Sequence, residues 1–321
     1  MAVRSKIKTG LSCVERKALR SKVQNLSEAK ISKVMFNRYG AAVRYFVIIT
    51  MMLCGPVSED LDTLDKQVQY FINLCWSEGE PKWLIGDTLS GISHFLQKRR
   101  ILSGSWKLYN VWDSLEDTVQ APPMPLDLLA PICGWFLANG RLDGSVSILL
   151  WFHCCLRTGE GLKVRWHHFI IGAFQSLLTL PDTKGGKRKR CLEKVTIEDA
   201  AIMHLLVNRM RHFHLLESVW QGSGFDFRKL WKACMLALGV ASIGFQPYSL
   251  RRGGATHYFV STGSLDAAVL RGRWESAKTG RNYIQQANET LARIQMEAMR
   301  CPAVDWYRKI WFDFAQSGAV S

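Results

Sequence analysis

Long apolar runs are missing from this chain of 321 residues. Its two longest mainly apolar stretches, Phe46–Cys54 and Val146–Leu156, are much shorter than the roughly 20 residues that a membrane-spanning helix requires. No segment repeats with a fixed period, which excludes repeat architectures. Because 48% of the residues are hydrophobic and 21% are charged, the chain has enough apolar material for two ordinary domains, and we expect it to be soluble.

Metal-binding and disulfide patterns are lacking too. The nine cysteines are odd in number, and no two have the C-x-x-C spacing of zinc ribbons. Several lie in apolar stretches with helical periodicity, so we predict a reduced intracellular protein without a disulfide framework. No carboxylate cluster of the kind that holds magnesium is evident, and we expect neither a metal nor a small-molecule cofactor.

Acidic residues are scarce: 27 Asp and Glu stand against 42 Lys and Arg, and the formal net charge is +15. Such a charge indicates a polyanionic partner, with nucleic acid favoured over an acidic membrane surface. Residues 1–33 carry nine basic side chains against Glu15 and Glu28, and they lack the apolar core of a secretory signal. We interpret them as a basic arm; it is either simply solvated, in contact with DNA, or a transit segment.

Helical periodicity dominates residues 34–112, for which we predict a small helical domain. The helices expected there are Val43–Met52, Leu64–Cys75, Trp83–Leu96 and a shorter piece at Trp106–Trp112. Residues 113–125 have weak periodicity and end in Ala121–Pro125, where three of five residues are proline. Prolines at this density are typical of an extended linker, so we place a domain boundary there.

The second domain, predicted over residues 126–300, mixes helices with one hairpin. Phe174–Thr183 and Arg188–Ile197 flank a Lys-Gly-Gly-Lys turn and are expected to pair as strands. The predicted helices are Leu126–Asn139, Ser145–Leu156, Asp199–His214, Phe227–Leu238, Tyr248–Val260, Leu265–Leu270 and Ala277–Ala287. The fold class is therefore mainly α with a small β-sheet (α+β).

The tail, residues 301–321, has helical periodicity of its own. Val304, Tyr307, Trp311 and Phe314 would share one face of a helix. Such a face either packs on its own domain or docks on a neighbouring subunit.

Three short stretches carry the candidate chemistry. Leu156–Glu160 places Arg157 at a helix end, with Glu160 three residues later to orient its guanidinium. Pro247–His257 places Arg251 in the first turn of a helix that contains small residues. Gly272–Tyr283 places Trp274 nine residues before Tyr283. Each pattern alone is common, since most Arg-x-x-Glu pairs are surface salt bridges.

Taken in this order, with a hairpin lysine between the first and second stretch, the motifs resemble the catalytic domain of tyrosine recombinases, the phage integrase family. The resemblance covers roughly Leu126–Gln286. The helical region before the proline linker resembles the core-binding domain of that family. The resemblance implies a site-specific DNA recombinase or integrase, for which a mobile element is a candidate origin.

The resemblance implies roles for individual residues. Arg157 and Arg251 match the two arginines that clamp the scissile phosphate, and Glu160 the carboxylate beside the first. Lys184 matches the hairpin lysine, Trp274 the family's His/Trp position and Tyr283 the nucleophile. Tyr248 stands where the family usually has histidine; a phenol can still donate a hydrogen bond to phosphate, but it does not readily accept a proton near pH 7.

The implied chemistry fits these residue types. A tyrosine that forms a covalent 3′-phosphotyrosine conserves the energy of the phosphodiester bond, so the reaction can reverse. Two arginines neutralise the phosphate without metal. Lys184 is our candidate for the general acid that protonates the leaving 5′ oxygen, and Lys187 is the alternative. Arg188, Lys189, Arg190, Arg252 and Arg281 are expected to contact DNA, although the run 187–190 is equally typical of a nuclear import patch.

The resemblance further implies that the two domains close around double-stranded DNA and that four chains assemble on two DNA sites. Two other functions fit the sequence: a type IB topoisomerase-like enzyme that nicks and reseals one duplex, and a domesticated DNA-binding protein without strand exchange, for which Tyr248 is the motivating feature. We expect an intracellular location: the nucleus in a eukaryote, the cytoplasm or nucleoid otherwise.

Overall fold

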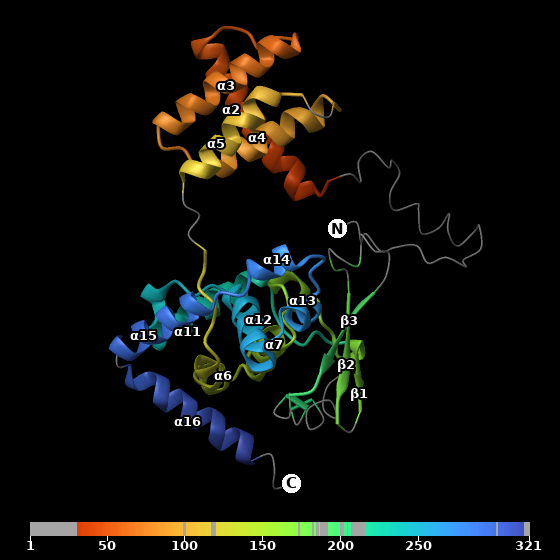
Figure 1. The fold of residues 1–321 in the computed structure, drawn as a ribbon, viewed down its shortest axis with the longest axis vertical. Helices are drawn as coiled ribbons and strands as arrows, with labels where there is room; N and C mark the ends of the chain where they lie inside the picture. The colour runs from red at the N-terminus through yellow and green to blue at the C-terminus, as the bar shows by residue number, and fades with distance from the viewer. Residues whose placement is uncertain are drawn as a thin grey trace, which may run out of the picture. The chain divides into compact units, whose positions relative to one another are not determined.

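The computed structural model describes residues 31–317 except 99–100, 117–119, 173, 182, 184–185, 187–191, 200–201, 204, 207–215 and 300. The chain divides into two compact units, residues 1–119 and 120–321 (Figure 1). This division lies inside the segment 113–125 that the sequence predicts as a linker. Within the described ranges, no helix combines the length and the apolar character that crossing a membrane demands.

The described part of the first unit is helical, as predicted. Its helices are α2 (Lys33–Leu53), α3 (Leu61–Ser77), α4 (Lys82–Phe95) and α5 (Ser103–Leu115). Ser32 and Asp60 begin α2 and α3, because each side chain accepts a hydrogen bond from a backbone N–H group three residues later. The apolar faces meet in one core around Phe46, Phe71 and Ile85.

The second unit holds the larger core, to which most of its helices contribute. They are η1 (Leu126–Leu128), α6 (Leu129–Ala138), α7 (Leu142–His153), α8 (Thr158–Gly161), η2 (Trp166–His168), α11 (Gly224–Ala237), η3 (Ala241–Ile243), α12 (Ser249–Thr262), α13 (Leu265–Gly272), α14 (Ala277–Arg281), α15 (Gln286–Met299) and α16 (Pro302–Ser317). Helix α12 packs against α7 and α13. Gly254 makes this approach possible, since a Cβ there would lie 1.9 Å from the carbonyl oxygen of Phe152.

A three-stranded antiparallel sheet lies beside these helices, in the order β1-β2-β3 (Figure 1). Its strands are β1 (Phe169–Ile171), β2 (Ser176–Leu180) and β3 (Glu193–Ile197). In β2, Leu178 is buried between Phe169 and Val195, its partners on the two neighbouring strands. The predicted β2–β3 hairpin and the mainly α fold class with a small sheet are confirmed. Strand β1 was not predicted, because three residues are too few to show a period.

Two predicted helices are not confirmed: one is interrupted, and most of the other lies outside the described residues. Ala277–Ala287 was predicted as one helix, but the chain leaves the helical path after Arg281 and resumes it at Gln286. This prediction was wrong; the backbone between α14 and α15 forms a turn that contains Tyr283. Most of the predicted helix 199–214 and most of the β2–β3 turn lie outside the described residues.

The tail forms helix α16, which packs along α6 of its own unit. Trp311 is buried, and Val304, Tyr307 and Phe314 contact the same core. The two backbones approach closely at Gly134, where a Cβ would lie 1.8 Å from the carbonyl oxygen of Tyr307. In this single chain the apolar face is therefore covered internally.

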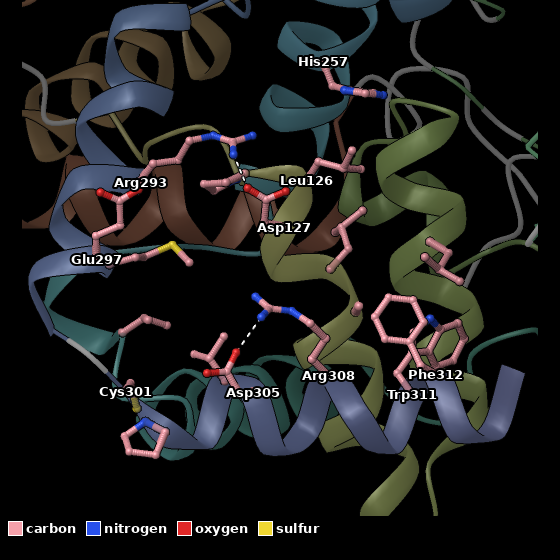
Figure 2. A pocket seen from close by; sticks show the side chains of 18 of the residues that line it. Leu126, Asp127, His257, Arg293, Glu297, Cys301, Asp305, Arg308, Trp311 and Phe312 are labelled. Carbon is pink, nitrogen blue, oxygen red and sulfur yellow. Dashed lines mark hydrogen bonds and ion pairs between the residues drawn. The ribbon is translucent and has the colours of Figure 1, made fainter.

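A cavity of about 1120 Å³ lies between α6, α15 and α16. Figure 2 shows Arg293 reaching toward Asp127 and Arg308 turning back to Asp305 on its own helix. The charges that line this cavity are thus largely neutralised by one another.

Candidate active site

Tyr283 lies in the turn between α14 and α15, and α12 holds that turn in place. Thr256 of α12 donates its hydroxyl hydrogen to the carbonyl of Tyr283 at 3.3 Å and accepts the backbone N–H of Gln285 at 3.1 Å. The backbone N–H of Tyr283 donates to Gly280 at 2.9 Å. Non-helical backbone at this point directs the phenol toward the side chains of α12 rather than along a helix face.

An aromatic and cationic stack surrounds the phenol. The Trp274 ring stacks on Tyr283, with centroids 4.5 Å apart and planes at 30°. The guanidinium carbon of Arg251 lies 5.0 Å from the Trp274 ring centroid and 5.2 Å from that of Tyr283. The structure therefore brings together three of the residues singled out from two separate motifs.

Arg251 is fully buried, with 0% of its surface exposed. Its guanidinium donates to the backbone carbonyls of Cys155 and, at 2.8 Å, Gly272. Among the described residues, its Nε has no hydrogen-bond partner. Two rigid backbone acceptors thus fix this cation beside the phenol, and one of its three nitrogens is left without an acceptor in the described part of the chain.

Arg157 and Glu160 form a second charged pair at the start of α8. The guanidinium of Arg157 lies 2.5 Å from Glu160 Oε1, and the backbone N–H of Arg157 donates to Oε2 at 3.0 Å. Glu160 also lies 3.9 Å from the guanidinium of Arg251. The Arg157 side chain is 31% exposed, so it is the arginine that solvent can reach.

Tyr248, the residue before α12, makes a side-chain contact that the sequence did not predict. Its hydroxyl donates a hydrogen bond of 2.6 Å to the hydroxyl of Tyr283. Burial, together with this contact, raises the pKa of Tyr248 to about 12. Burial also acts to raise the pKa of Tyr283, but the hydrogen bond from Tyr248 and the charge of Arg251 outweigh it and lower that pKa. Tyr283 is therefore the phenol of the pair that ionises first.

Solved structures of DNA recombinases share this architecture. XerH site-specific recombinase bound to difH substrate superposes with a TM-score of 0.55 at 13% identity, over 88% of this chain and 84% of that one. A lambda integrase dimer bound to a COC′ core site gives 0.56 at 13%, over 82% and 74%. Tn1549 transposon integrase in complex with transposon right end DNA gives 0.54 at 10%, over 88% and 97%.

The chain has the tyrosine recombinase fold. No protein-family model and no curated protein matches the sequence. At identities of 10–13%, fold similarity is detected where sequence similarity is not. The tyrosine recombinase fold is thus carried here by a divergent sequence, and the roles of its site residues stay predictions.

Arg252 was expected at the DNA surface, but the structure places it elsewhere. It is 8% exposed and donates to the carbonyl of Ala121 and the side chains of Gln120 and Gln285. It therefore fastens the entering segment of the second unit to the turn after Tyr283. Because these contacts occupy its guanidinium, the structure gives no support to a DNA contact by this residue.

Arg273 was missed by the sequence analysis, although it touches the site directly. Its guanidinium donates to Glu160 Oε2 at 2.9 Å. Burial acts to raise the pKa of Glu160, but the charge of Arg273, followed by the contacts from Arg157, keeps that pKa below its ordinary value. No signal in the sequence marks Arg273, because the burial of its carboxylate partners Glu160 and Glu193 is visible only in the structure.

The remaining predicted site residues fall into two groups. Lys184, Lys187, Arg188, Lys189 and Arg190 lie outside the described residues. Arg281 is exposed at the end of α14, two residues before Tyr283, where it is free to meet a polyanion. Within the described part of the chain, no group of His, Cys, Asp and Glu is arranged to hold a metal ion.

Proposed function

We propose that this protein cleaves and rejoins DNA strands through a covalent 3′-phosphotyrosine at Tyr283, as a site-specific recombinase or integrase. The observation that carries the proposal is the surroundings of Tyr283: its hydroxyl accepts a hydrogen bond from Tyr248, and the buried guanidinium of Arg251 lies 5.2 Å from the centroid of its ring. A phenol needs help of this kind to act as a nucleophile at neutral pH.

In the proposed step the phenolic oxygen of Tyr283 attacks the phosphorus as its proton leaves to solvent. The new bond joins phosphorus to the tyrosine oxygen, and the bond from phosphorus to the 5′ oxygen breaks. The leaving 5′ oxygen takes a proton, for which Lys184 is the proposed donor. Attack by a 5′ hydroxyl on the phosphotyrosine reverses the step and seals a strand, so neither hydrolysis nor an energy source is needed.

Charge in the site supports attack on a phosphodiester. Arg157 and Arg251 are permanently protonated and are proposed to hold the phosphate: the partly exposed Arg157 presents N–H groups to its oxygens, and the fully buried Arg251 adds positive charge behind Tyr283. Tyr248 keeps its own proton while Tyr283 loses one, so its hydrogen bond stabilises the phenolate. In this proposal Tyr248 acts on the nucleophile rather than as the base that a histidine could supply at this position.

Double-stranded DNA is the proposed substrate. The formal charge of +15 suits a polyanion, and the solved structures of this fold described above are bound to DNA. A tetramer on two DNA sites is the proposed assembly. In this assembly, the proposed core-binding domain is residues 34–112 and the proposed catalytic domain is residues 126–300. The basic arm 1–33 is proposed as an added DNA contact. We also propose an intracellular location, because the substrate is DNA.

The proposal is tested by trapping the protein–DNA adduct. Purified protein is incubated with a random-sequence duplex library in excess chelator, the reaction is stopped with detergent, and DNA that stays attached to protein is sequenced. A duplex of the recovered sequence, labelled at the 5′ end upstream of the break, should transfer its label to the protein. Tyr283→Phe should abolish transfer while half-site binding persists.

The same duplex separates the alternative functions. Exchange of strands between two labelled duplexes supports a recombinase, whereas relaxation of supercoils without exchange supports a topoisomerase-like enzyme. Binding without any adduct would leave only the DNA-binding protein and would contradict the proposal.

A further inference from the structure

Arg273 occupies a backbone position that favours glycine. It follows α13 with φ 58° and ψ 38°, in the left-handed region that side chains with a Cβ disfavour. The turn is closed by the N–H of Trp274, which donates to Val269 at 3.1 Å. The turn brings Trp274 onto Tyr283, and glycine would form it with less strain. An arginine at this position adds backbone strain, which indicates that contacts of its side chain compensate for that strain.

That side chain is directed entirely into the protein. It is 7% exposed, and its two terminal nitrogens donate to the carbonyls of Cys154 and Cys155 at 3.0 and 3.3 Å. One of them also donates to Glu160 at 2.9 Å, while Nε lies 3.5 Å from Glu193 at the start of β3. Arg273 therefore cannot reach a DNA phosphate without leaving these partners.

The contact with Glu160 fixes one side of that carboxylate. Oε2 receives Arg273 and the backbone N–H of Arg157, and Oε1 is left to the guanidinium of Arg157. Three charged groups face Glu160 among the described residues: Arg157 from α8, Arg251 from α12 and Arg273 after α13. Only Arg157 among them is substantially exposed.

We propose that Arg273 is a positioning residue for DNA cleavage: it anchors Glu160, and Glu160 in turn orients the guanidinium of Arg157 toward the scissile phosphate. This inference rests on the proposed function. It predicts that loss of the Arg273 side chain slows cleavage without weakening DNA binding.

The test compares Arg273→Gly with the parent in single-turnover adduct formation on the recovered duplex. Glycine keeps the left-handed turn, and with it Trp274, so the variant removes only the side chain. We expect a slowing of about 10- to 150-fold, as for loss of one charge-assisted hydrogen bond. Half-site affinity should stay within about threefold. Rates are normalised to the fraction of active molecules.

The pH profile separates positioning from a purely structural role. Arg273 lowers the pKa of Glu160, so its removal raises that pKa. As pH falls, Glu160 should then be protonated earlier, and cleavage by Arg273→Gly should decline at a higher pH than cleavage by the parent. Arg273→Lys keeps the positive charge but has fewer hydrogen-bond donors. Its cleavage rate should fall roughly 2- to 10-fold, and the pH at which its rate declines on the acid side should stay that of the parent.

Arg271→Ala is the matched control. Arg271 lies two residues earlier and donates to His153 and Thr196 at 2.9 and 2.6 Å, without touching Glu160. Its loss should lower stability but leave the rate per active molecule and the acid limb unchanged.

Three results for Arg273→Gly would overturn the inference: a parental cleavage rate, a slower rate with no shift of the acid side of the pH profile, or a loss of DNA affinity. If Arg273→Gly does not fold, the cleavage rate of Arg273→Lys takes its place, and a parental rate in that variant overturns the inference. A parent protein that forms no adduct contradicts the proposed function instead.

Discussion

Replacing Tyr248 by phenylalanine tests the most specific contact in the site. The change removes one hydroxyl, which donates at 2.6 Å to the hydroxyl of Tyr283, and it leaves the ring in place. A hydrogen bond to a charged group contributes about 1.5–3 kcal/mol, so the phenolate of Tyr283 should be less stable by that amount. At pH values below the pKa of Tyr283, cleavage should slow roughly 10- to 150-fold.

The assay is the single-turnover rate of adduct formation as a function of pH. The hydrogen bond lowers the pKa of Tyr283, so its loss raises that pKa. The rate of Tyr248→Phe should therefore rise with pH over a more alkaline range than the parental rate, and the defect should shrink at high pH. Tyr248→His, which still offers a donor, should keep more activity than Tyr248→Phe.

A defect of constant size at every pH would refute this reasoning, because it would place the Tyr248 hydroxyl on the phosphate instead. An unchanged rate would make Tyr248 a packing residue.

Two further predictions concern the general acid and the tail. Lys184→Ala should cleave the normal substrate slowly but recover its rate when sulfur replaces the bridging 5′ oxygen, since a thiolate leaves without protonation. Arg157→Ala should stay slow on both substrates. A recovered rate in Arg157→Ala, or no recovery in Lys184→Ala, would contradict the assigned roles. Trp311→Ala should lower the free energy of unfolding by about 3–5 kcal/mol in urea titrations, because Trp311 is 6% exposed in the core of its own unit. Unchanged stability together with lost cooperative assembly on DNA would instead support docking of the tail on a neighbouring subunit.

Sequence reasoning reached the site because its residue types are chemically distinctive. Arg157, Glu160, Arg251, Trp274 and Tyr283 lie in three separate stretches, and the structure brings them to one place. The mainly helical fold could be predicted for a similar reason, since apolar periodicity is strong in long helices and a hairpin has recognisable turn residues.

The misses have physical causes. Arg273 was overlooked because a left-handed backbone conformation is normally signalled by glycine, and nothing local shows that distant carboxylates stabilise an arginine there. The end of α14 at Arg281 was missed because the turn that follows it is held by Thr256, far away in sequence. The hydrogen bond from Tyr248 to Tyr283 could not be predicted for the same reason, since the position of Tyr283 depends on the contact with Thr256.

The tail illustrates a different limit. An amphipathic helix shows that one face must be covered, but not by what. The structure covers that face of α16 with α6 of the same chain. The close approach at Gly134 could not be read from periodicity.

Mass spectrometry of the trapped protein–DNA adduct, after protease and nuclease digestion, identifies the residue that carries the covalent bond. We predict one modified peptide, with a nucleotide joined through its 3′ phosphate to the phenolic oxygen of Tyr283, formed equally well in excess chelator. A nucleotide on Tyr248 or on any other residue, attachment through a 5′ phosphate, or an adduct that persists in Tyr283→Phe would contradict it.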